Sequence, residues 1–303
     1  KPEFQAAVIL KISEKPKLYE AIKEVCAKVK TKIPDTVIFH IEPTFFVTEG
    51  KLRTIDGLVK NRTLAIGAPL VRQLTINEFK SILAHEFAHF SGNDTVYSRF
   101  VVPVYKSVNS AINDIAGINE GNKGDNNVMN AMSLLLFVPV IFLKIFIMYF
   151  ATIDNILSRS RELRADWIAS SNFGKKNMES GLVKVVQISQ HYHSAAEELG
   201  FSNPNYLDKY EQLLHRDSNK LEEYKQKALL EVEQVFDTHP KLSTRLASLP
   251  DTDYASDPHG MEEIIQEILT DEKTLSDSYQ QLLKNYTEYQ EKTEKIKKEF
   301  NLL

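Results

Sequence analysis

The chain has 303 residues, of which 43% are hydrophobic, which is enough to bury one large core or two smaller ones. Its net charge is −4 and it has no large basic face, which argues against a nucleic-acid partner. The single cysteine, Cys26, excludes an internal disulfide framework and a cysteine cluster for a structural metal.

The N-terminal part of the chain predicts one amphipathic helix followed by a small β-sheet. Between Leu18 and Lys30 the apolar residues recur on one side at helical spacing. Short runs rich in β-branched and aromatic residues then predict three strands, at Val37–Ile41, Phe45–Val47 and Leu64–Gly67. We expect these strands to form a sheet just before the next helix.

That next helix begins at a capping box. The side chain of Thr75 can accept the amide hydrogen of Glu78, and the Glu78 side chain can reach back to the amide of Thr75. Apolar residues follow at helical spacing from Phe79 to Phe90, and Gly92-Asn93 provides a C-terminal stop. The sequence therefore predicts a helix with one buried face.

This helix carries His85-Glu86-Phe87-Ala88-His89. Positions four apart lie on the same helix face, so the imidazoles of His85 and His89 can both reach one metal ion. Glu86 can then serve as general base for a water molecule at that ion. The pattern also arises by chance in unrelated chains, so the interpretation depends on a third ligand.

The segment after this helix contains the longest apolar run of the chain. Residues 113–130 are rich in Asn and Gly and predict a mobile loop, which either covers the active-site cleft or only links two helices. Residues 131–151 are apolar except at Ser133, Pro139 and Lys144, and about 20 such residues suffice to span a membrane.

Lys144 would cost ~2.5–3.5 kcal/mol at mid-depth in a bilayer, and Pro139 would kink a helix there. The alternatives are a buried core helix and a helix lying at the membrane interface. We favour a helix that associates with or enters the membrane.

Residues 158–167 predict a second helix with metal-site chemistry. Glu162 and Asp166 are four apart and point the same way, so Glu162 can bind a metal while Asp166 accepts the free N–H of a ligand histidine. The alternative is a solvated face on which Arg159, Arg161 and Arg164 pair with these carboxylates. Beside the first helix, that alternative is the weaker one.

The remaining histidines lack metal-ligand spacing. His191 and His193 lie in a segment that predicts a helix, where positions two apart diverge by about 200° and cannot share an ion. His40, His215 and His259 have no partner at ligand spacing, so we expect all five to be structural or surface residues.

The last part of the chain differs in character. Apolar residues recur at helical spacing over 261–286 amid many Glu and Lys residues, which predicts two amphipathic helices. They could dock onto the rest of the chain or present a partner-binding face, and packing is the default.

Three motifs together resemble the gluzincin metallopeptidases of the HtpX-like and CAAX-prenyl-protease (Ste-type) family, over about residues 19–249. The first is His85 to His89 followed by Gly92 and Asp94. The second is the segment 158–166, with its Arg-Glu-x-x-Ala-Asp core. The third is Asp237-Thr238-His239-Pro240, followed by Arg245.

The resemblance implies a zincin-like fold of the α+β class, predominantly α-helical, with a small β-sheet next to the H-E-x-x-H helix. It implies one Zn²⁺ per chain, bound by His85, His89 and Glu162, with Glu86 as the base. Asp166 would be the partner of a ligand histidine.

His239 would stabilise the tetrahedral intermediate, with Arg245 ordering its segment; the alternative is an ordinary loop histidine. In gluzincins an edge strand binds the peptide by β-augmentation, and Leu64, Ala65, Ile66 and Gly67 are the candidates. The alternative for this strand is a purely structural role.

We therefore expect a zinc metallopeptidase domain over residues 1–255 and a C-terminal helical extension over 256–303. Because the chain begins at Lys1 rather than at methionine, we expect a fragment or a processed form. Relatives of this kind carry membrane-spanning segments ahead of the catalytic domain.

The expected function is an endopeptidase that acts on membrane-associated or misfolded proteins. Its catalytic domain would face the cytoplasm at the inner membrane of a bacterial cell. The alternative is a non-catalytic, chaperone-like membrane scaffold. An aminopeptidase is less favoured, because no motif recognises a free peptide terminus.

Overall fold

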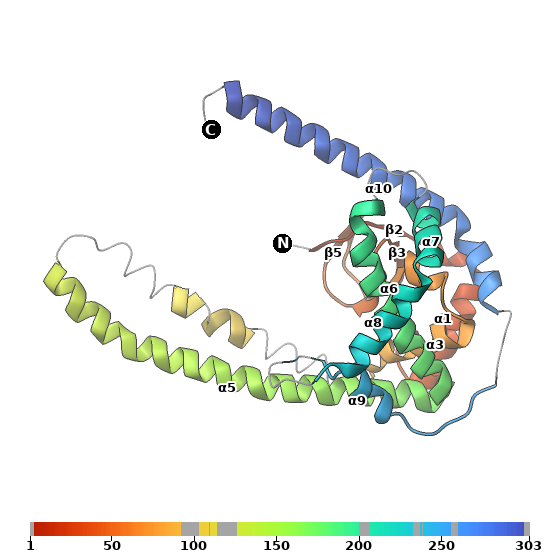
Figure 1. The fold of residues 1–303 in the computed structure, drawn as a ribbon, viewed down its shortest axis with the longest axis horizontal. Coiled ribbons are helices and arrows are strands. Elements are labelled where there is room, and N and C mark those ends of the chain that lie inside the picture. The colour runs from red at the N-terminus through yellow and green to blue at the C-terminus, as the bar shows by residue number, and fades with distance from the viewer. Residues whose placement is uncertain are drawn as a thin grey trace.

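The computed structural model describes residues 3–91, 103–108, 110–113, 126–199, 206–232, 237, 239–255 and 260–299. Over these residues two small β-sheets lie among helices, and two long helices extend away from the body (Figure 1). These are α5 (Asn126–Phe173) and α10 (Gly260–Glu299). The fold is of the α+β class and predominantly helical, as the sequence predicts.

The larger sheet has four strands in the order β2-β3-β7-β4. Strand β7 (Thr63–Gly67) is parallel to β3 (Thr36–His40) and antiparallel to β4 (Phe45–Thr48). Strand β2 (Ala7–Ile9) forms the other edge. The second sheet contains β1 (Glu3–Phe4), β5 (Leu52–Thr54) and β6 (Gly57–Val59).

The prediction that Leu64, Ala65, Ile66 and Gly67 form an edge strand is wrong. These residues belong to β7, where Leu64 pairs with Val37 on one side and with Val47 on the other. All five residues of β7 are buried. Because both sets of backbone groups are already paired, β7 cannot accept a peptide as an added strand.

Gly67 ends β7 at a point of close backbone approach. A Cβ atom at this position would lie 2.2 Å from the carbonyl oxygen of Glu42 and 2.5 Å from that of Thr44. The connection between β3 and β4 therefore lies directly on Gly67, and only glycine fits beneath it.

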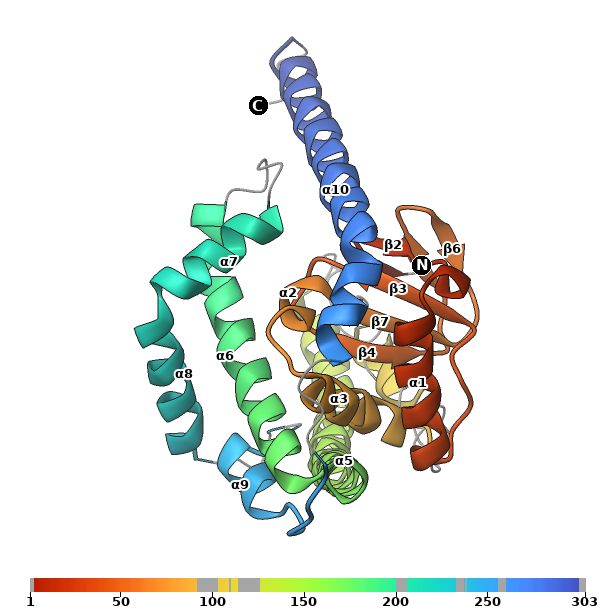
Figure 2. The same ribbon diagram turned by 90° about the vertical axis from the view of Figure 1, so that its right-hand side faces the viewer.

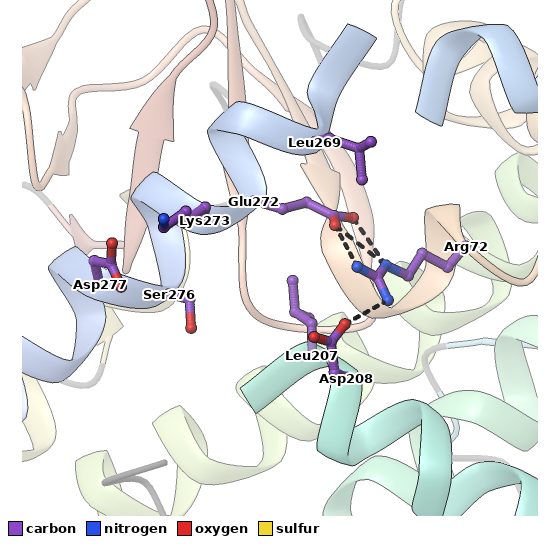
Figure 3. Close-up of a pocket in the computed structure, with 8 residues that line it drawn as sticks. All are labelled: Arg72, Leu207, Asp208, Leu269, Glu272, Lys273, Ser276 and Asp277. Atoms are coloured by element: carbon purple, nitrogen blue, oxygen red, sulfur yellow. Dashed lines mark hydrogen bonds and ion pairs between the residues drawn. The ribbon is translucent and has the colours of Figure 1, made fainter. Parts of the chain in front are cut away.

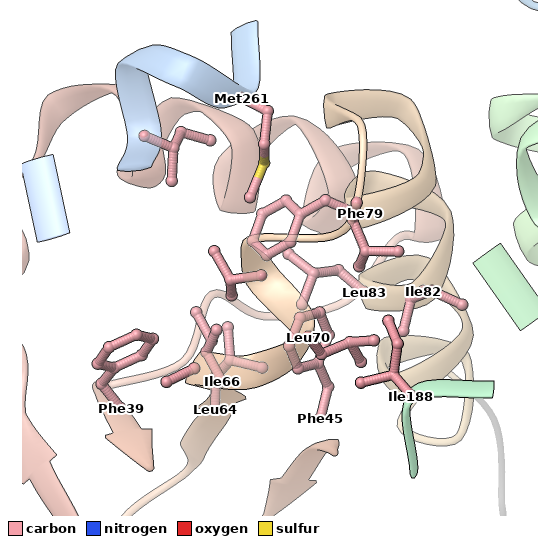
Figure 4. Packing of buried hydrophobic residues seen from close by; sticks show 14 of the residues in the cluster. Phe39, Phe45, Leu64, Ile66, Leu70, Phe79, Ile82, Leu83, Ile188 and Met261 are labelled. Atoms are coloured by element: carbon pink, nitrogen blue, oxygen red, sulfur yellow. The ribbon is translucent and has the colours of Figure 1, made fainter. Parts of the chain in front are cut away.

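Helices α1 (Pro16–Val29) and α3 (Ile76–Ala88) pack together beside the larger sheet (Figure 2). The capping box of α3 is present as predicted: Glu78 N donates to Thr75 Oγ1 at 3.3 Å, and Thr75 N donates to Glu78 Oε2 at 2.7 Å. Figure 4 shows Phe79 and Leu83 of α3 packed with Ile66 of β7 in the buried core. The apolar face thus fixes α3 on the sheet.

A second group of helices lies on the other side of α3 (Figure 2). Helix α6 (Lys175–Leu199) packs on α3, since a Cβ atom at Gly181 would lie 3.2 Å from the Ile82 side chain and Ile188 belongs to the same core. Further elements are η1 (Ile12–Glu14), α2 (Ala68–Val71), α7 (Tyr206–Arg216), α8 (Ser218–Leu230) and α9 (Leu242–Ala247), and residues 103–108 and 110–113 are also helical.

The apolar run predicted over 131–151 lies within α5, which continues through Pro139 to Phe173. Its described side chains are largely exposed, and only 6% of the most apolar window in Val138–Phe173 is buried. The described part of this run, residues 138–151, is therefore not a core helix. Residues 126–130, predicted to end a loop, are the first residues of α5; residues 114–125 lie outside the described part of the chain.

Helix α10 is continuous where the sequence predicts two helices. The segment 270–274 contains no glycine or proline to end a helix, so the gap in the apolar pattern is a helical turn rather than a break. Met261, Ile264 and Leu275 are buried in the same core as α1 and α3. The first half of the predicted extension is therefore packed against the rest of the chain.

A cavity of about 530 Å³ lies between α7 and α10 (Figure 3). Arg72, directly after α2, reaches its wall and donates hydrogen bonds to Glu272 of α10 and to Asp208 and Glu211 of α7. The Arg72 side chain thus connects the end of α2 with α7 and α10. None of the residues that line the cavity is a predicted site residue.

Candidate metal centre

The two histidines of the predicted motif lie near the C-terminal end of α3. His85 is in the last turn, and His89 is the C-cap residue with helical dihedral angles (φ −61°, ψ −20°), so it keeps the helical phase. Their ring centroids are 5.0 Å apart. The motif thus holds both imidazoles on one side of the helix end.

Glu162 of α5 completes the group. Its Oε2 lies 3.5 Å from His85 Nε2, and its Oε1 lies 3.5 Å from His89 Nε2. One ligand atom from each of the three residues lies within 4.8 Å of the others. Two atoms bound to a tetrahedral zinc ion at 2.0–2.1 Å are roughly 3.3–3.4 Å apart, so this donor set fits zinc.

Asp166, one turn after Glu162, contacts the ring of His85 through the nitrogen that does not face Glu162. Its Oδ1 lies 2.8 Å from His85 Nδ1, on the side of the ring opposite to the one that faces Glu162. Arg245 of α9 donates two hydrogen bonds to the same carboxylate, from Nε to Oδ2 at 2.7 Å and from Nη2 to Oδ1 at 2.6 Å. This arrangement fixes the ring orientation of a ligand histidine.

The charges at the site shift the pKa values of its members. Burial disfavours the charged form of His85, but its bonds to Asp166 and Glu162 outweigh this and raise the pKa of His85 to about 9. Burial acts against ionisation of Glu162 and Asp166 as well. The hydrogen bonds of Glu162 with His239 and His85, and those of Asp166 with Arg245 and His85, nevertheless hold both pKa values below the ordinary range.

Glu86 directly follows His85, the first candidate ligand in the chain. Desolvation of its carboxyl group, with a further contribution from the negative charge of Glu162, raises the pKa of Glu86 to about 7. A carboxylate with a pKa near the working pH is suited to accept and then return a proton.

His239 lies on the open side of the group. Its Nδ1 is 3.4 Å from Glu162 Oε1, its side chain is 67% exposed, and the bond to Glu162 raises the pKa of His239. The structure thus brings together His85, Glu86, His89, Glu162, Asp166, His239 and Arg245, whereas Gly92, Asp94 and Thr238 lie outside its described residues.

Two positioning residues were not predicted as such. Arg159 Nη1 donates to the carbonyl oxygen of Asp237 at 2.9 Å, which attaches the His239 segment to α5. Arg164 Nη2 donates to the carbonyl oxygen of Ala88 at 3.1 Å, next to His89. These partners are 78 and 76 residues away in sequence, so no local pattern could reveal them.

The other described histidines lie apart from the site. His40 is buried with Nδ1 3.2 Å from Gln5 Nε2, and His191 is buried with Nε2 3.4 Å from Asp217 Oδ2. His191 and His193 are both on α6, as the sequence predicts. Within the described residues the only group spaced to hold a metal is His85, His89 and Glu162.

A family model described as peptidase family M48 matches residues 54–253. The chain is 25% identical over 237 residues to a "Protease HtpX homolog" of Polaromonas naphthalenivorans, which covers 77% of the chain and 70% of that relative. It is 25% identical over 194 residues to "Protease HtpX" of Haemophilus ducreyi and 26% identical over 187 residues to that of Actinobacillus pleuropneumoniae serotype 5b. Each of these two matches covers 60% of the chain and 61% of the relative. No solved structure matches the chain.

Proposed function

The chain belongs to peptidase family M48, and on this basis we propose that it is a zinc-dependent endopeptidase. The observation that carries the proposal is the group of His85, His89 and Glu162, whose ligand atoms lie within 4.8 Å of one another. Glu86, directly after the first ligand, supplies the general base.

Zinc held by these three residues would polarise the scissile carbonyl and lower the pKa of a water molecule beside it. Glu86 takes the proton from the attacking water and delivers it to the leaving amine. His239 donates a hydrogen bond to the oxyanion, since its raised pKa favours the protonated ring. Asp166 and Arg245 keep the ring of His85 in place during these steps.

We propose β4 as the strand that binds the peptide substrate. It lies at an edge of the four-stranded sheet and runs alongside α3. At one end, the Phe45 ring contacts that of Phe79 in the first turns of α3. At the other end, Thr48 pairs with Thr63, next to Arg62, whose guanidinium lies 5.9 Å from the ring of Phe87. A peptide added along β4 therefore leads toward the histidine end of α3.

We also propose that α5 anchors the enzyme in a membrane with the catalytic residues on the cytoplasmic side. The apolar run of residues 131–151 and the exposed apolar side chains from Val138 to Leu157 each extend about 30 Å at 1.5 Å per residue, which matches the hydrocarbon core. Arg159, Arg161 and Arg164 follow directly, and basic residues flank the cytoplasmic end of membrane helices. Membrane-associated or misfolded proteins are then the natural substrates.

The test compares the wild type with Glu86→Gln and Glu162→Ala for bound zinc and for casein hydrolysis. Glu86→Gln keeps the three ligands, so we expect full zinc content and a rate lower by about 10²–10⁴-fold. Glu162→Ala is expected to lose zinc. Stoichiometric zinc without chelator-sensitive hydrolysis in the wild type would favour the scaffold. Equal zinc in all three proteins would exclude Glu162 as a ligand.

A further inference from the structure

One continuous helix carries both the membrane-facing surface and a metal ligand. The apolar arm, defined here as residues 138–157 of α5, exposes large side chains along its length, with Phe142 68%, Tyr149 65% and Ile156 52% exposed. The same helix continues to Glu162 and Asp166 without interruption. The distance between the apolar arm and the metal site is therefore set by helix geometry.

That distance is short. The apolar run of residues 131–151 ends at Ala151, and Leu157 is the last large exposed apolar side chain before Arg159; the exposed Trp167 lies beyond Glu162. The membrane boundary lies between these two residues, because Asp154 and Asn155 between them are polar. Glu162 follows Leu157 by five residues and Ala151 by eleven, which at about 1.5 Å per residue is roughly 7–17 Å along the axis.

The helix cannot pivot freely between the apolar arm and the site. Arg159 is bonded to the Asp237 carbonyl, Arg164 to the Ala88 carbonyl, and Asp166 to His85 and Arg245. These bonds begin two residues after Leu157 and join α5 to α3 and α9. A tilt of α5 in the bilayer would only bring the site closer to the surface.

We infer that this chain cleaves peptide bonds close to the membrane surface, within roughly the first two to five residues outside the hydrocarbon core. The estimate follows from an extended peptide, which advances about 3.3 Å per residue over the 7–17 Å height of the site. The substrate class is the juxtamembrane segment of a membrane protein. This inference rests on the proposed function, both for the peptidase activity and for the position of α5 in the bilayer.

The experiment places one cleavable sequence at different heights above the same bilayer. The full chain is reconstituted in vesicles of phosphatidylcholine and phosphatidylglycerol, together with substrates built on one transmembrane helix. Helical EAAAK spacers of 5, 10 and 20 residues lift the cleavable sequence by about 7, 15 and 30 Å. We expect cleavage with the two shorter spacers and a rate at least tenfold lower with the longest. Equal rates at all three heights would overturn the inference.

A matched variant moves the site instead of the substrate. Seven alanine-rich residues inserted between Leu157 and Ser158 add two helical turns and raise the site by about 10 Å while nearly preserving the helix face. We expect the preferred spacer to shift by about seven residues, from 5–10 to roughly 12–17. An unchanged preference in a variant that still cleaves the free peptide would also overturn the inference.

Hydrolysis of the free peptide in detergent separates this inference from the proposed function. A wild type that cuts the free peptide but ignores spacer length is a peptidase without the height restriction. A wild type that fails on the free peptide contradicts the proposed function itself. If the insertion variant fails to fold, the spacer series on the wild type still decides the question.

Discussion

Asp166 connects His85 with Arg245 at the candidate metal site. Its side chain is fully buried, and its Oδ1 accepts from both His85 Nδ1 and Arg245 Nη2, while Oδ2 accepts from Arg245 Nε. The forked guanidinium fixes the plane of the carboxylate. The carboxylate in turn fixes the ring of His85, so Arg245 orients a residue of the candidate metal site through Asp166.

The first prediction concerns Arg245→Lys. A lysine keeps the positive charge but cannot hold both oxygens of Asp166, so His85 loses its fixed orientation. We expect zinc affinity to fall by about 10–100-fold, measured by competition with a chromophoric chelator. Arg53→Lys, at an exposed position in β5, is the matched control. If Arg245→Lys binds zinc as tightly as the wild type, the two-bond contact between Arg245 and Asp166 is not needed for zinc binding.

The second prediction concerns His40, which is buried away from the site. Burial lowers the pKa of His40 to about 4, from 6.5 in the unfolded chain. Between these two pKa values the unfolded chain binds more protons than the folded chain. The contribution of neutral, buried His40 to the free energy of unfolding is therefore complete above pH 6.5 and is lost as the pH falls toward 4. The loss is roughly 3 kcal/mol at about 1.4 kcal/mol per pH unit.

Urea unfolding from pH 7 to pH 4 measures this loss against His40→Gln, which does not titrate and can still face Gln5. We expect the stability of the wild type to fall toward that of the variant, or below it, as the pH decreases. A constant difference across this range would mean that His40 takes no part in the acid sensitivity.

The elements that the sequence predicts correctly are those set by local chemistry. The capping box at Thr75 and Glu78 starts α3, and the apolar spacing gives α1 and α3 within two residues of their observed ends. His85 with His89, and Glu162 with Asp166, each share a helix face, so their spacing predicts which way they point. The spacing also made Glu162 the candidate third ligand, but only the folded chain shows that the two pairs lie together.

The elements that the sequence misses depend on contacts between distant segments. Strand β7 enters the sheet between β3 and β4, and no property of Leu64 to Gly67 distinguishes an inner from an edge position in this order. The break predicted between two C-terminal helices is bridged because Leu275 and Tyr279 are buried against the same core as Ile264 and Ile268. Strand order and helix continuity were therefore decided by packing.

The third prediction concerns how α10 is joined to α1. The Glu267 carboxylate accepts from the backbone amides of Lys17 and Leu18 at 2.9 and 3.1 Å, and so caps the start of α1 from another helix. Glu267→Ala should destabilise the fold by about 1 kcal/mol, measured by urea unfolding. Gln266→Ala, at the exposed position directly before it on α10, should change little. Equal losses in the free energy of unfolding in the two variants would contradict a capping role for Glu267.

At the scale of the whole molecule, a packed body carries a helix with no protein partner along most of its described apolar surface. Only 6% of the most apolar window of α5 is buried, although the ring of Tyr105 lies 5.2 Å from that of Phe150. An exposed apolar surface of this length is found on proteins that contact a membrane or another protein. Figure 1 shows α5 extending well beyond the body.

The fourth prediction tests the membrane as that contact. The double variant Phe142→Asp with Phe146→Asp places two carboxylates on the apolar arm, each costing roughly 2.5–3.5 kcal/mol in the hydrocarbon core. We expect the variant to be lost from the floating fraction in a vesicle flotation assay. Ser218→Asp with Asn219→Asp, on exposed residues of α8, adds the same charge and should float as the wild type does. Flotation of both variants would exclude the apolar arm as the anchor.

The bonds between Asp166 and Arg245 also relate completion of the candidate metal site to the order of synthesis. Arg245 follows Asp166 by 79 residues, and at about 5–20 residues per second the ribosome needs roughly 4–16 s to add them. The apolar arm precedes both residues and leaves the ribosome first. With the apolar arm as the proposed membrane anchor, a nascent chain would meet the bilayer before the candidate metal site is complete, so the proposed peptidase would be inactive while it is being inserted.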